Sequence, residues 1–258
     1  QSRSSAASDV YKRQARDMLQ DLLDNYDLDE TYKAAVIDNL KRLTKDNNVG
    51  LPKLNWYNKK DHKKLRHNFR NSKNIEKNYA ESYQDMFVLS MLNGKKNGTY
   101  LEIGAGNSFY GNNTALMEVN YDWKGVAIDI DENFVNAHNS ERKHNCVLKD
   151  ALKINYERFL LGLDMPNDID YLQLDCDPPE VTYKILLNMP FETHRFAVIT
   201  YEHDYYCDET KSFRNKSRKY LESFGYKLVV DNISPDDERP YEDCLLYTSD
   251  AADDLLCV

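Results

Sequence analysis

A short apolar stretch that runs into two glycines, with two carboxylates further along, is the part of this sequence best suited to chemistry. Thr99–Ile103 reads as a buried strand, and Gly104 and Gly106 follow it directly. Glycine lets the backbone turn tightly and approach a ligand. Asp129 and Asp150 end the next two apolar segments. In an open parallel sheet these strand ends meet at one edge, where the first aspartate can bind ribose hydroxyls and the second an adenine amino group. Taken singly, each is also an ordinary turn glycine or helix-capping aspartate.

Glu102, just before the glycines, separates two kinds of nucleotide ligand. The spacing Gly104-x-Gly106, with Gly111 next, is not the G-x-G-x-x-G fingerprint of dinucleotide-binding folds. A carboxylate at this place repels a pyrophosphate and attracts a cation. We therefore expect Glu102 and Asp129 to flank one crevice shaped for a cationic nucleoside. An NAD(P)-dependent Rossmann oxidoreductase and a non-catalytic Rossmann-like binding module remain as alternatives.

A second group of ionisable residues follows two later strand candidates. Asp175 and Asp177 should end one strand, and Glu202, His203 and Asp204 the next, so that all meet at one edge of the sheet. Group transfer to an alcohol needs a base for its proton, and we expect His203 or Asp175 to be that base. Asp177 and Glu202 are candidate substrate contacts. Together with Asp175 they could instead hold magnesium or manganese, which is the lesser alternative.

Several stretches, taken in order, resemble the FkbM-type methyltransferase family. They are Ser82–Asp85, Tyr100–Gly106, Asn113-Thr114, Trp123–Val126, Ile128-Asp129, Asp170–Asp177 and Ile199–Asp204. The resemblance implies a class I methyltransferase fold, S-adenosyl-L-methionine as cofactor and methylation of a hydroxyl oxygen, with a small molecule or glycan as the expected acceptor. The cofactor contacts that it implies lie at or near Glu102, Gly104, Ala105, Gly106, Asp129 and Asp150. Where many members have an acidic residue followed by glycine, this chain has Asp177-Pro178-Pro179-Glu180, which concerns the substrate loop.

The order of elements predicts a Rossmann-like α/β domain whose mostly parallel sheet has helices on both faces. Strands are expected at 99–103, 125–130, 145–149, 169–174, 196–201 and 227–231, and helices between them include 180–188 and 210–224. Two apolar stripes at helical spacing precede this pattern. We therefore predict an N-terminal helical extension over 15–81 and a methyltransferase domain over 82–243.

Both chain ends resemble a translated transposase-type sequencing adapter, read on opposite strands. The matching residues are SSAASDVYKRQ at 4–14 and CLLYTSDAADD at 244–254. Residues 1–14 and 244–258 are therefore expected to be non-native. On this interpretation the last strand of the sheet is truncated after Asp243, and 244–248 could pair in its place and cover the open edge.

The composition limits the partners. The net charge of −9 argues against general nucleic-acid binding. The locally basic stretch Asn58–Lys77 is either a solvated helix face or a patch that steers an anion. Cys146, Cys176 and Cys207 are widely spaced, which favours a reducing, cytoplasmic setting. No apolar run approaches the ~20 residues that span a membrane. The expected partner is a small-molecule or saccharide acceptor, and the sequence does not indicate an oligomeric state.

Overall fold

The computed structural model describes residues 69, 70, 72, 75, 78–208, 212–233 and 242–247. The two helices predicted before residue 48, and nearly all of the basic stretch 58–77, lie outside the described residues. Among the residues that are described, no helix combines the length and the apolar character needed to cross a membrane.

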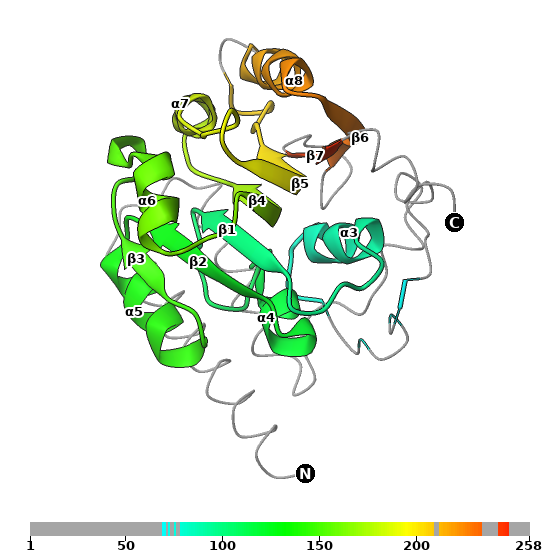
Figure 1. Ribbon diagram of the computed structural model, residues 1–258. Coiled ribbons are helices and arrows are strands. Elements are labelled where there is room, and N and C mark those ends of the chain that lie inside the picture. The colour runs from blue at the N-terminus through cyan, green and yellow to red at the C-terminus, as the bar shows by residue number, and fades with distance from the viewer. Residues whose placement is uncertain are drawn as a thin grey trace, which may run out of the picture. The chain divides into compact units, whose positions relative to one another are not determined.

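Seven strands form one mixed sheet in the order β3-β2-β1-β4-β5-β7-β6 (Figure 1). The strands are β1 Thr99–Ile103, β2 Lys124–Asp129, β3 Cys146–Leu148, β4 Asp168–Leu174, β5 Arg195–Glu202, β6 Tyr226–Ile233 and β7 Glu242–Tyr247. β1 to β5 pair in parallel, whereas β7 runs antiparallel to both β5 and β6. This is the Rossmann-like arrangement of class I methyltransferases, and the predicted fold class is confirmed.

The helices cover both faces of the sheet, as predicted. They are α3 Gln84–Met91, α4 Ala115–Tyr121, α5 Glu132–Glu141, α6 Tyr156–Gly162, α7 Pro179–Leu187 and α8 Phe213–Ser223, with a 3₁₀ turn, η4, at Ala151–Lys153. The main apolar core lies between the sheet and α6, α7 and α8, where Leu101, Leu160 and Ile185 are buried together. Tyr100 points to the other face, since side chains alternate along a strand, and its hydroxyl donates to Glu118 of α4.

The six predicted strands and two named helices are confirmed to within a few residues, and residues 244–247 pair at the place where the sequence allowed a substitute for the last strand. β7 continues through Tyr247 and pairs on both sides, with Leu245 opposite Ile199 of β5 and Leu228 of β6. The physical reason for this pairing is the apolar composition of the segment, which the sequence already showed. The row Cys244–Tyr247 is apolar enough to fill a gap between two strands that would otherwise expose their edges.

The Ser82–Asp85 motif fixes the entry into α3. Asp85 is fully buried, and its carboxylate accepts hydrogen bonds from the backbone N–H groups of Tyr79, Ala80 and Met86. The Gln84 side chain accepts from the backbone N–H of Ser82. Burial outweighs these bonds and raises the pKa of Asp85 to about 6. The motif therefore organises the backbone before α3.

Trp123 closes the end of the sheet opposite the glycine turn. Its ring is fully buried and its Nε1–H donates to the Lys95 carbonyl at 2.7 Å. The ring lies so close to Gly98 that a Cβ there would stand 2.5 Å from it. Glycine at this position is therefore required by the ring that packs on it.

Replacing Trp123 should reveal this contact as a loss of stability. We expect Trp123→Ala to lower the free energy of unfolding by about 3–5 kcal/mol, because it removes a large buried ring and leaves a cavity. Urea unfolding followed by circular dichroism measures the difference. Leu161→Ala is the control, since Leu161 is exposed and should change stability by no more than roughly 0.5 kcal/mol. Equal small losses for both variants would contradict the packing described.

Candidate functional site

The glycine turn after β1 brings the backbone against the ends of two neighbouring strands. Gly104 and Gly106 have φ angles of +80° and +54°, which side chains rarely adopt. The N–H of Gly104 donates to the carbonyl of Ile128 in β2 at 2.9 Å. On the other side, a Cβ on Gly104 would stand 1.6 Å from the Asp175 carbonyl oxygen at the end of β4. Only glycine allows this approach.

Asp129, the last residue of β2, is joined directly to the glycine turn. Its Oδ2 accepts from the N–H of Gly106 and its Oδ1 from the N–H of Asp131, each at 2.8 Å. The predicted pairing of the turn with this carboxylate is therefore present in space. Beside it, Ile130 is 72% exposed and Leu148 48% exposed, at the ends of neighbouring strands. These two apolar side chains were not among the predicted site residues.

Glu102 lies on the same sheet face as Asp129, but it is covered. Register pairs Glu102 with Ala127, two residues before Asp129, so both carboxylates project to the side of α4 and α5. Glu102 is 1% exposed and accepts from the Thr114 hydroxyl at 2.8 Å. Burial raises its pKa to about 7, although the nearby Arg142 guanidinium opposes the shift. Both carboxylates therefore lie on the same face of the sheet, as expected, and the loop after the turn covers Glu102.

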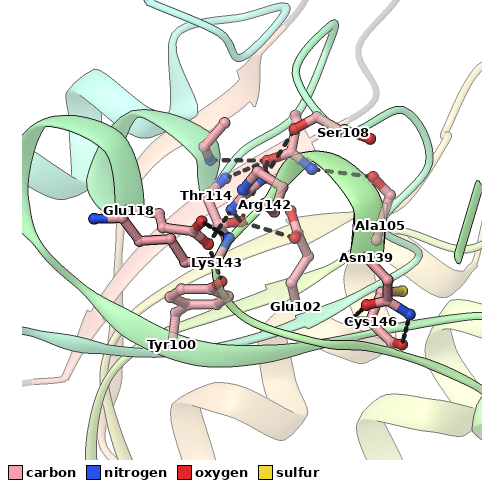
Figure 2. A network of polar contacts seen from close by, with 12 residues as sticks. Tyr100, Glu102, Ala105, Ser108, Thr114, Glu118, Asn139, Arg142, Lys143 and Cys146 are labelled. Carbon is pink, nitrogen blue, oxygen red and sulfur yellow. Dashed lines mark hydrogen bonds and ion pairs between the residues drawn. The ribbon is translucent and has the colours of Figure 1, made fainter. Parts of the chain in front are cut away.

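Arg142 is a site residue that sequence reasoning missed, and Figure 2 shows it at the centre of a polar network above Glu102. Its Nη2 donates to Thr114 Oγ1 at 3.1 Å and to Glu118 Oε2 at 3.0 Å. Its Nη1 donates to the Ser108 carbonyl at 2.9 Å. No pattern in the sequence identifies it, because it lies in a polar stretch at the end of α5 and only the fold brings it under the loop.

Asp150 follows β3 and has a local structural contact. Its Oδ1 accepts from the backbone N–H of Leu152, so that it caps η4. An ion pair with Lys153 at 2.9 Å lowers the pKa of the Asp150 carboxyl. The helix-capping interpretation of this residue is thus realised, and an adenine contact stays a prediction.

The carboxylates predicted at the ends of β4 and β5 do come together, in two pairs. The Asp175 carboxyl interacts with that of Glu202, and the Asp177 carboxyl with that of Asp204. Burial and the Asp177 charge raise the pKa of Asp204 to about 7. Burial, with Asp177 and Asp129 nearby, also raises the pKa of Asp175. The edge of the sheet formed by these carboxylates can therefore carry protons near neutral pH.

His203 is buried at the end of β5, and both of its ring nitrogens face protein groups. Nδ1 accepts from the backbone N–H of Tyr205 at 3.2 Å, and Nε2 lies 3.5 Å from Asp243 Oδ1 in β7. A nitrogen that accepts an N–H is unprotonated, so the proton belongs on Nε2. Burial lowers the pKa of His203. The ring thus links the loop after β5 to β7.

Two further features identified in the sequence are the Pro-Pro sequence after Asp177 and the alternative metal site. Pro179 is the first residue of α7, so the Pro-Pro sequence after Asp177 starts a helix. Within the described part of the chain, no three His, Cys, Asp or Glu side chains are arranged to hold a metal ion. The Asp175, Asp177 and Glu202 alternative therefore has no assembled ligand set in this structure.

Comparison with known proteins gives similarities at the level of the fold. No family profile and no curated protein matches the chain. The chain is similar to the solved structure of a putative rRNA-methylase from Clostridium thermocellum, with 15% identity, a TM-score of 0.45 and coverage of 66% of this chain and 93% of that one. A SAM-dependent methyltransferase from Aquifex aeolicus has 18% identity and a TM-score of 0.43, with coverage of 65% of this chain and 92% of that one. The structure of Aeropyrum pernix fibrillarin is in complex with natively bound S-adenosyl-L-methionine. It has 14% identity and a TM-score of 0.43, with coverage of 59% of this chain and 67% of that one.

Proposed function

We propose that this chain is an S-adenosylmethionine-dependent methyltransferase that acts on a hydroxyl group of a small molecule or glycan. The observation that carries the proposal is the separation of the glycine turn from the N-terminus of the helix that follows it, α4. α4 begins only at Ala115, and the N–H groups of Thr114 and Ala115 already donate to Asn112 Oδ1. A pyrophosphate in a dinucleotide fold binds at such an N-terminus. The arrangement thus favours a nucleoside without phosphates over NAD(P).

The residues around the turn fit S-adenosylmethionine chemically. Asp129 offers carboxylate oxygens at the strand end where a ribose diol is expected. Ile130 and Leu148 offer exposed apolar surface for an adenine ring. Glu102 supplies negative charge toward the ammonium and sulfonium groups. When bound, the cofactor supplies the methyl group.

Of the two bases expected from the sequence, we propose Asp175 as the group that takes the acceptor proton. Asp175 is half-buried beside Gly104, and its raised pKa strengthens the carboxylate as a base. We assign His203 to the positioning of the loop after β5, because Nδ1 accepts from the backbone N–H of Tyr205 and Nε2 is buried facing Asp243 of β7. The acidic rim formed by Asp177, Glu202 and Asp204 favours neutral or cationic acceptors over phosphate-rich ones. The hydroxyl acceptor itself follows from the FkbM-type resemblance.

Cofactor binding tests the assignment of Asp129. The full chain should bind S-adenosylmethionine and S-adenosylhomocysteine but not NAD in calorimetry and thermal shift. Asp129→Asn should weaken both by about ten- to a hundredfold, the cost of a hydrogen bond to a charged group. Asp131→Asn is the matched control, since Asp131 is an exposed helix cap that asparagine also fills. Binding of NAD alone would establish the oxidoreductase alternative instead.

The charge of Glu102 predicts a pH dependence of binding. Its pKa of about 7 means that the free protein is partly protonated at this carboxyl near neutrality. The ammonium group of the ligand favours the ionised form, so affinity for S-adenosylhomocysteine should rise as pH increases from about 6 to 8. Glu102→Gln should flatten the rise. A wild-type affinity that falls over this interval would contradict the role of Glu102.

The assignment of the base predicts different outcomes for two variants. Asp175→Asn should lower turnover on a hydroxylated acceptor by about 10²–10⁴-fold, as expected for loss of a general base. Its affinity for S-adenosylhomocysteine should change far less. A radiolabelled methyl-transfer assay against a panel of glycans, hydroxylated small molecules and RNA measures turnover.

His203→Ala is the comparison variant for the same assay. If His203→Ala loses turnover while Asp175→Asn keeps it, the base is His203. Methylation of RNA alone would contradict the proposed acceptor class. Cofactor binding without turnover on any acceptor would favour the non-catalytic module.

A further inference from the structure

We infer that Arg142 is a positioning residue of the proposed cofactor site, which holds the loop after the glycine turn in place and favours the ionised form of Glu102. The inference rests on the proposed function. Arg142 lies at the end of α5, where its backbone N–H donates to the His138 carbonyl at 2.8 Å. Its side chain is fully buried and lies over the Phe109 ring at 5.8 Å.

The first part of the argument is mechanical. Arg142 Nη1 reaches Asn112 Oδ1 at 3.1 Å, and Asn112 Nδ2 donates to the carbonyl of Ala105 within the turn at 3.1 Å. The same guanidinium holds the Ser108 carbonyl. The planar fork of arginine thus fixes two points of the loop at once, and one asparagine passes that constraint to the turn.

The second part is electrostatic. Thr114 Oγ1 accepts from Arg142 Nη2, and of its two acceptors Glu102 Oε2 at 2.8 Å is closer than Asn112 Oδ1 at 3.2 Å, which favours donation to the carboxylate. Donation to Glu102 favours its ionised form, as does the cation behind it. Glu118 competes for the same guanidinium at 3.0 Å. Arg142 is therefore the charge that makes two buried carboxylates compatible.

Besides Arg142, hydrogen bonds from Thr114 and Asn112 lower the pKa of Glu102, whereas a like charge nearby raises it. Glu118 of α4 supplies that charge. Tyr100 precedes Glu102 in β1 and donates a hydrogen bond to Glu118. Burial, together with the charges of Glu102 and Asp129, raises the pKa of the Cys146 thiol in β3. None of these groups carries a positive charge. Loss of Arg142 should therefore raise the pKa of Glu102 further, and the pKa distinguishes this role from simple packing.

The test uses the full chain with S-adenosylhomocysteine as probe. Arg142→Met alone would strand Glu118 as a buried charge, so the variant is the pair Arg142→Met with Glu118→Gln, compared with Glu118→Gln alone. Arg158→Met, at an exposed arginine of α6, is the matched control. Calorimetry across pH gives the affinity. Carbon-13 NMR of the Glu102 carboxyl gives its titration without ligand.

We expect the paired variant to bind S-adenosylhomocysteine about tenfold or more weakly at neutral pH, the scale of one charge-assisted hydrogen bond. The midpoints of Glu102 titration and of the pH dependence of affinity should both move to higher pH. Arg142→Lys keeps a cation but loses the fork, so it should retain the titration midpoint and lose affinity. Arg158→Met should match the wild type in both measurements.

Wild-type affinity and midpoint in a folded paired variant would overturn the inference. If that variant does not fold, Arg142→Lys decides, because wild-type affinity there would equally overturn it. Failure of the proposed function looks different, since the wild type itself would then not bind S-adenosylhomocysteine. In that case the ligand-free titration still decides whether Arg142 favours the ionised form of Glu102: an upward shift supports this role and an unchanged midpoint overturns it.

Discussion

The site depends on a contact of two strand ends, the hydrogen bond from the N–H of Gly106 to the carboxylate of Asp129 at 2.8 Å. It joins the turn after β1 to the end of β2. On its other side the same turn meets β4, where Gly104 leaves no room for a Cβ beside the Asp175 carbonyl. Three strands are thereby tied at one edge of the sheet, the edge at which open α/β folds bind their ligands. The junction places the glycine turn, Asp129 and the start of the segment after β4 beside one another.

The parallel part of the fold was predictable because its strands are buried on both faces. Segments such as Tyr171–Leu174 and Val198–Tyr201 are nearly continuous apolar runs, which β-sheets covered by helices require. The antiparallel strand β7 was not predictable in the same way. Its pairing depends on the gap between β5 and β6, which is a property of the assembled sheet. Composition could show only that residues 244–247 suit such a gap.

The residues of the candidate site likewise fall into those that the sequence could predict and those that it could not. Strand-end residues such as Asp129 and Asp175 could be found because the position of a residue in a parallel strand fixes the edge at which it emerges. Arg142 could not, because the end of a helix reaches the site only through tertiary packing. The covering of Glu102 was missed for the same reason. A strand pattern gives the face of a side chain, but it does not show which loop folds over that face.

Burial and like charge together explain how so many acids are held at one edge. Desolvation raises the pKa of Glu102, Asp175 and Asp204, so each can accept a proton instead of adding an unbalanced charge. In the ligand-free protein the edge is therefore less negative than its formal count. A cationic nucleoside entering beside Asp129 would restore the charges and release protons to solvent. Because an anion would have the opposite effect, the same acids that repel one another favour a cationic ligand.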